Sequence, residues 1–131
     1  MIGLDTNVLV RYIADDDPAQ NAAATKIIES LSPNSRGFIS LVVLVELIWV
    51  LQFSYDFNKS EITTIIEKIL RSAELQVERS EIVNQALGQF RFSRADFSDC
   101  LIDRCSDTAG CQYTLTFDKR AASTGKMRLV H

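Results

Sequence analysis

Four acidic residues occupy positions where carboxylates could do chemistry. Asp5 directly follows the short apolar segment 1–4, and Asp118 directly follows the apolar segment 113–117. Both segments are predicted strands, and the carboxyl ends of parallel neighbouring strands meet at one edge of a sheet. Glu46 interrupts the apolar run 41–51, where a buried carboxylate would need a partner. Asp99 falls in the first turn of a predicted helix, so we expect all four acids to gather.

Carboxylates gathered in this way repel one another, which raises their pKa values and opposes folding. A divalent cation removes this repulsion, and magnesium suits the site because it prefers carboxylate oxygens and keeps several of its waters. One or two such ions can deprotonate a water molecule and neutralise charge on a phosphate during in-line attack. The four acids therefore predict metal-assisted chemistry on a phosphate.

The composition excludes several other kinds of site. The only histidine is His131, so Ser-His-Asp and Cys-His arrangements have no suitably placed base. Cys100, Cys105 and Cys111 contain no Cys-x-x-Cys pair, which favours reduced thiols over a disulfide framework or a zinc site. With 17 acidic and 14 basic residues the net charge is −3, so no large basic surface for nucleic acid is expected.

The length and the hydrophobic pattern predict a single domain over residues 1–131. The longest apolar run, 41–51, is broken by Glu46 and is too short to span a bilayer. The N-terminus has neither the basic region nor the cleavage site of a secretory signal. We therefore expect a cytoplasmic protein with no membrane partner.

Short apolar strands alternate with helices along the chain, which is typical of a parallel sheet covered on both faces. Strands are predicted at 1–4, 36–40, 74–79, 111–117 and 127–130, and helices at 6–14, 18–32, 41–55, 59–72, 80–90 and 95–110, with a helical turn at 118–124. Asp17, Ser40, Ser60 and Ser80 are the predicted N-caps, and Gly110 is expected just beyond a helix end.

Each acid also has a simpler structural interpretation, and for Glu46 it is a side chain that faces solvent or meets an arginine. For Asp5 and Asp118 this interpretation is helix capping alone, because aspartate is a favoured N-cap residue. Asp96, Asp99, Asp103 and Asp107 form one stripe along a helix, and here Asp96 is expected as the N-cap, with Asp103 and Asp107 in solvent. Three polar neighbours of the acids could orient a carboxylate or a metal-bound water, or only form local turns: Thr6, Asn7 and Thr116.

Four segments, in order, resemble the acidic motifs of PIN-domain ribonucleases, above all VapC-type toxins: "MIGLDTNVLVRYI", "ISLVVLVELIWVL", "ADFSDCLI" and "LTFDKR", followed by "KMRLV". The resemblance implies a three-layer α/β/α sandwich with a central, mainly parallel sheet. It makes Asp5, Glu46, Asp99 and Asp118 the acids around magnesium or manganese, with Asp96 as an accessory acid, and it matches Thr116 to the family's hydroxyl residue. It further implies endonucleolytic cleavage of RNA, a VapB-type antitoxin as partner, and a homodimer.

Two other functions remain as alternatives. One is a catalytically silent PIN-fold module that binds RNA or protein. The other is a phosphotransfer enzyme of the haloacid dehalogenase type, which usually needs a second aspartate where this chain has Asn7.

Substrate and partner contacts can also be assigned from the sequence. Five basic residues in or near the site segments are candidates for phosphate contacts, although ordinary surface charge is the commoner role for any one of them: Arg11, Arg91, Arg94, Lys119 and Arg120. An apolar groove between the second and fourth predicted helices is expected to receive an antitoxin helix.

Overall fold

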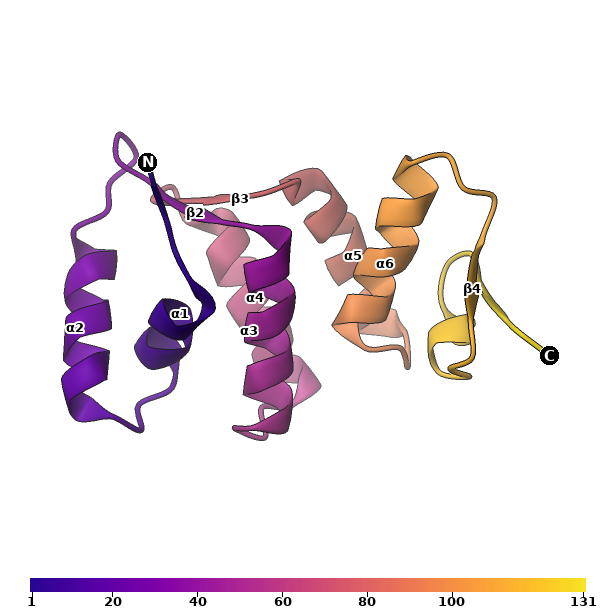
Figure 1. Cartoon of the computed structure of the whole chain (residues 1–131), viewed down its shortest axis with the longest axis horizontal. Helices are drawn as coiled ribbons and strands as arrows, with labels where there is room; N and C mark the ends of the chain where they lie inside the picture. Colours follow the sequence, from indigo (N-terminus) through magenta and orange to yellow (C-terminus); the bar gives the residue numbers. More distant parts are fainter. The chain divides into compact units, whose positions relative to one another are not determined.

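The computed structural model describes all residues, 1–131, and the chain divides into two compact units, Met1–Glu78 and Arg79–His131 (Figure 1). In Figure 1 the first unit runs from indigo to rose and the second continues through orange to yellow. The prediction that residues 1–131 form a single domain stays a prediction.

The first unit contains a three-stranded parallel sheet in the order β1-β2-β3. Its strands are β1 (Ile2–Gly3), β2 (Gly37–Ile39) and β3 (Leu75–Val77). Its helices are α1 (Thr6–Ile13), α2 (Pro18–Glu29), α3 (Leu41–Phe53) and α4 (Lys59–Arg71). All of these elements lie within the ranges predicted from the sequence, because each has a clear apolar pattern and most have recognisable caps.

The helices of the first unit pack through apolar stripes. Helix α1 packs against α2 and α3, and α4 packs against α3 and β3. On α3 the side chains of Leu44, Leu47 and Leu51 are fully buried, while Val42 and Trp49 on the opposite side are exposed. The run 41–51 is therefore a helix with one buried face. None of the helices in the structure combines the length and the apolarity that a membrane crossing would require.

The second unit contains two helices and a parallel strand pair. Its elements are α5 (Ser80–Phe92), α6 (Phe97–Thr108), β4 (Thr114–Thr116), the short 3-10 helix η1 (Ala121–Ser123) and β5 (Met127–Leu129). Helices α5 and α6 lie side by side (Figure 1). Phe90 and Phe97 meet edge to face between them, with ring centroids 5.9 Å apart. All strand pairs in both units are parallel, as predicted.

Two predicted N-caps are wrong. Helix α4 is capped by Asn58 rather than Ser60, because Asn58 and Glu61 form a reciprocal capping box whose two hydrogen bonds measure 2.8 and 3.1 Å. Helix α5 begins at Ser80 itself, and its N-cap position is held by Arg79 in the left-handed conformation with φ of 51°. Asn58 caps α4 in place of Ser60 because the capping box satisfies two backbone N–H groups at once.

The prediction that Asp103 lies in solvent is also wrong. Its side chain is 1% exposed and accepts hydrogen bonds from Lys126 N at 2.8 Å and from Gln89 Nε2 at 3.1 Å. Arg104 completes the ion pair at 3.2 Å and also contacts Asp107, so Asp107 too is paired rather than free in solvent. A buried carboxylate requires such partners. Asp103 thereby fastens the turn before β5 to α5 and α6.

Gly125 in this turn should tolerate no side chain. It has φ of +52°, and a Cβ added there would lie 1.8 Å from Asp103 Oδ2. We expect Gly125→Ala to lower the free energy of unfolding by about 3 kcal/mol or more, because the buried ion pair must be displaced. Gly88→Ala is the control, since nothing lies within 4 Å of its added Cβ inside α5. It should instead stabilise by about 0.5–1 kcal/mol. Urea denaturation of the two variants measures both effects, and equal midpoints would contradict the account.

Candidate functional site

The first candidate acid, Asp5, lies where β1 ends and α1 begins. Strand β1 is held on β2 by hydrogen bonds that include Leu4 N to Phe38 O at 2.9 Å. Asp5 is then the N-cap of α1, and its Oδ1 accepts the Thr6 backbone N–H at 2.8 Å. Asp5 therefore caps α1, and its role as a metal ligand stays a prediction. The cap uses one carboxylate oxygen, and Oδ2 forms no hydrogen bond on the exposed surface.

Thr6 links Asp5 to Glu46 in the first unit. Its side chain is buried, and its hydroxyl donates a 2.9 Å hydrogen bond to Glu46 Oε1 on α3. Glu46 is exposed, so the expected burial of this carboxylate is not observed. Helix α3 buries one face and exposes the other. Glu46 lies on the exposed face together with Val42 and Trp49. Asn7, the other polar neighbour, is exposed.

The second unit brings Asp96, Asp99 and Asp118 near one another. Asp96 is the N-cap of α6, as predicted, and its backbone N–H donates to Asp99 Oδ2 at 3.3 Å. Asp118 follows β4, and its Oδ1 accepts the backbone N–H groups of Arg120 at 2.8 Å and Ala121 at 3.4 Å. Thr116 Oγ1 accepts the Asp118 backbone N–H at 3.0 Å, so this hydroxyl fixes the turn that presents the acid.

The charge of the Asp99 carboxylate is opposed by its surroundings. Burial raises the pKa of its carboxyl above the ordinary value of 3.8. The negative charges of Asp96 and Asp118 raise this pKa further, while the Asp96 N–H and the Arg120 guanidinium lower it. The three acids are thus close enough to interact electrostatically, and a cation beside them would relieve the repulsion.

The donor atoms within each unit are of the kind that a hard divalent cation prefers. The candidate ligands are all carboxylate oxygens, and the local donors to Asp5, Asp99 and Asp118 occupy single oxygens of each carboxylate. Magnesium takes one or two protein carboxylates and completes its shell with water. Neither unit by itself holds a group of three or more acidic, histidine or cysteine side chains arranged for a metal ion. The residues fit the metal chemically, and their role in binding it stays a prediction.

The five predicted phosphate contacts have different surroundings. Arg120 extends over the acidic region, with Nη2 3.7 Å from Asp96 Oδ1 and Nε donating to Arg94 O at 3.2 Å. Arg91, Arg94 and Lys119 are exposed. Arg11 instead pairs with Asp16 at 3.2 Å and contacts the Tyr55 hydroxyl at 3.4 Å. That pairing favours a structural role for Arg11 in the α1–α2 connection.

Two sets of contacts in the site are not predicted by the sequence. The bond from Thr6 to Glu46 spans 40 residues, so nothing in the local pattern indicates it. Arg120 combines a backbone donor to Asp118 with a guanidinium near Asp96, and its place directly after the Asp118–Lys119 pair was the only available signal.

Comparison with known proteins decides the family. The family model described as the PIN domain matches residues 2–127. The chain belongs to the PIN domain family. This membership confirms the predicted α/β/α fold class with a mainly parallel sheet and the resemblance on which that prediction rested.

Individual relatives of this PIN domain are distant. A protein named VapC ribonuclease from Aquifex aeolicus (strain VF5) is 22% identical over 122 residues, which cover 93% of this chain and 90% of the relative. The crystal structure of Mycobacterium tuberculosis VapC20, described as a sarcin-ricin loop cleaving toxin, is 19% identical with a TM-score of 0.47. The matched region covers 98% of this chain and 99% of the VapC20 chain.

The raised pKa of Asp99 predicts how the folding stability of the metal-free protein depends on pH. The folded state holds the Asp99 proton more tightly than the unfolded chain, so this stabilisation is present at low pH and is lost as pH rises from 3.8 through the folded pKa. Asp99→Asn should therefore be more stable than the parent chain near neutral pH, by up to about 1 kcal/mol. The gain should vanish near about pH 3, where both carry no charge at this position. Thermal denaturation in EDTA at both pH values measures it, and a less stable variant at neutral pH would contradict the electrostatic account.

Proposed function

We propose that this PIN domain, spanning residues 1–131, is a metal-dependent endoribonuclease and the toxin of a VapBC-type toxin–antitoxin pair. Three findings support the proposal: family membership over nearly the whole chain, the relative named VapC ribonuclease, and the strand-end and helix acids of each unit. The crowding of Asp96 and Asp118 around Asp99 is the observation that carries it, because such repulsion has a physical use when a cation binds.

The four main acids are assigned as the metal ligands: Asp5, Glu46, Asp99 and Asp118. When bound, magnesium or manganese would supply a water of lowered pKa and neutralise charge on the scissile phosphate. Thr6 would hold the Glu46 carboxylate through its hydroxyl, and Thr116 would hold the turn that carries Asp118. Asp96 orients Asp99 through its backbone N–H and is proposed as the accessory acid. Asn7 is proposed to contact metal-bound water.

The nuclease assignment predicts RNA cleavage in magnesium or manganese that stops on addition of EDTA. Asp5→Asn and Asp99→Asn should each lower the cleavage rate by about 100-fold or more, because each removes a metal ligand. Asp56→Asn is the matched control, since Asp56 is exposed, lies outside the four acids and has a positive φ that asparagine also adopts. The measurement is the cleavage rate of a labelled RNA.

Growth of a bacterial host distinguishes a toxin from a silent module. Expression of the parent chain should arrest growth, and expression of Asp5→Asn should not. If both chains allow equal growth and neither cleaves RNA while both bind it, the chain is the catalytically silent PIN-fold module. The proposed homodimer and cytoplasmic location are tested by sedimentation of the purified protein and by fractionation of the same cells.

The proposed antitoxin site is an apolar groove in the first unit. A cavity of about 540 Å³ is lined from α1, α2 and α4, which agrees with the groove predicted between the second and fourth helices. Its apolar lining includes Leu9, Ile13, Ile28, Ile65 and Ile69, and charged residues Glu29, Lys68 and Glu74 also border it. A groove of this kind receives the apolar face of an amphipathic helix. We assign that helix to the antitoxin.

Adjacent isoleucines on α2 provide a test of this groove. Ile28 lines the cavity, whereas Ile27 is 39% exposed and does not. Ile28→Glu should weaken binding of the antitoxin about tenfold or more, because a charge would be buried against the partner. Ile27→Glu should bind as the parent does. Calorimetric titration with the protein encoded by the neighbouring reading frame measures both, and equal affinities would place the antitoxin elsewhere.

A further inference from the structure

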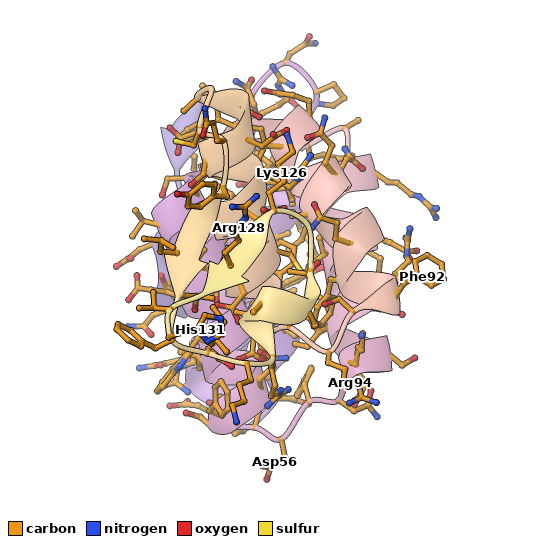
Figure 2. All side chains as sticks on the ribbon, turned by 90° about the vertical axis from the view of Figure 1, so that its right-hand side faces the viewer. Asp56, Phe92, Arg94, Lys126, Arg128 and His131 are labelled. Carbon is orange, nitrogen blue, oxygen red and sulfur yellow. The ribbon has the colours of Figure 1, made fainter.

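Phe92 is the most exposed large apolar side chain of the protein. It is the last residue of α5 and is 92% exposed, and its ring projects outward from the ribbon (Figure 2). Phe90, two residues earlier, is 2% exposed and packs against Phe97. The end of α5 is therefore anchored by one phenylalanine while the other contributes almost nothing to the core.

The segment after Phe92 is fixed relative to the acids. Ser93 N donates to Phe90 O at 3.4 Å, and Ser93 Oγ accepts Ala95 N at 2.9 Å. Arg120 Nε donates to Arg94 O at 3.2 Å. Three residues therefore separate the exposed ring from Asp96, the N-cap of α6. The backbone that carries Phe92 is thus joined to the N-cap of α6 by a short hydrogen-bonded segment.

Basic residues lie in this connection and in the segment bonded to it. Arg91 and Arg94 flank Phe92 and Ser93 in the sequence, and both are exposed. Lys119 and Arg120 directly follow Asp118, and the Arg120 backbone N–H binds the Asp118 carboxylate. The Arg94 guanidinium forms no hydrogen bond or ion pair in the structure, so it is available to a ligand. A protein of net charge −3 thus concentrates four basic residues in two short segments that are joined through Arg120.

We propose that Phe92 is a stacking platform for an unpaired base of single-stranded RNA, with Arg94 and Arg120 contacting the adjoining phosphates. The inference rests on the proposed nuclease function and names one residue of its RNA-binding surface. An exposed aromatic ring beside basic residues is the combination that binds single strands, because each base offers a flat face and each phosphate a negative charge. A base inside a duplex has both faces covered, so the ring selects unpaired segments.

RNA binding measured in EDTA tests the stacking platform, because removal of the metal prevents cleavage of the RNA. The probe is a fluorescently labelled single-stranded oligoadenylate, and fluorescence anisotropy gives its dissociation constant. Phe92→Ala should weaken binding about tenfold, and Phe92→Trp should restore it, because tryptophan also stacks on bases. Phe53→Ala is the control, since Phe53 is 58% exposed and lies on α3. It should bind as the parent does.

Fluorescence gives a direct readout of stacking. The chain has one tryptophan, Trp49, so Phe92→Trp in a Trp49→Phe background leaves a single fluorophore at the proposed platform. Stacking on the oligoadenylate should quench its emission, and a duplex of the same sequence should quench it much less. Quenching by both, or by neither, would overturn the selection of unpaired bases. A purely structural role for Phe92 would not produce strand-dependent quenching.

The remaining outcomes separate this inference from the nuclease proposal. If Phe92→Ala binds RNA as tightly as the parent, the platform is wrong even when the parent cleaves RNA. If the parent does not cleave but binding depends on the ring, the platform stands and the nuclease proposal fails. If Phe92→Ala changes only the oligomeric state in sedimentation, the ring belongs to an interface between copies of this chain and the platform is rejected.

Discussion

Each candidate carboxylate of this PIN domain is held by a hydrogen bond from a nearby uncharged group. Asp5 and Glu46 are both bonded by Thr6, through its backbone N–H and its hydroxyl. Asp99 accepts the N–H of Asp96, and Asp118 accepts the N–H groups of its own turn. These donors orient the acids without cancelling their charge. The arrangement therefore preserves a negative potential that a bound cation could neutralise.

The fate of Asp103 shows the contrast. It lies on the same helix as Asp99, but it is fully buried and forms an ion pair with Arg104. Its backbone and side-chain partners join α5, α6 and the turn at Gly125. Because a buried charge must be paired, Asp103 is satisfied by protein alone. The aspartates of α6 thus divide into Asp103 and Asp107, which pair with cationic side chains, and Asp99, which has no cationic hydrogen-bond partner and remains available to a ligand.

An acidic protein that acts on RNA must overcome repulsion from its substrate. The proposed metal would remove the local repulsion at the carboxylates, and the basic segments around Arg94 and Arg120 would attract the backbone nearby. The exposed ring of Phe92 adds an attraction that does not depend on charge. In this proposal a few basic residues take the role of the broad positive surface that is not expected at a net charge of −3.

The sequence by itself determined the helices, the strands and the positions of the acids along them. Periodic apolar residues define α4, and Asp17 with Pro18 defines the start of α2. These features are local, because capping and burial patterns depend on residues within one or two turns. The four motifs also predicted the family, since their order along the chain is preserved in the sequence itself.

Only the tertiary structure decided how individual side chains are surrounded. The spacing of Asp96, Asp99, Asp103 and Asp107 predicts one common stripe, yet Asp103 is buried because the turn at 124–126 folds over it. Glu46 is exposed because α3 buries only its other face, and its bond to Thr6 crosses 40 residues. Burial and pairing depend on segments that are distant in the chain. A pattern within one helix carries no information about what those segments bring to it.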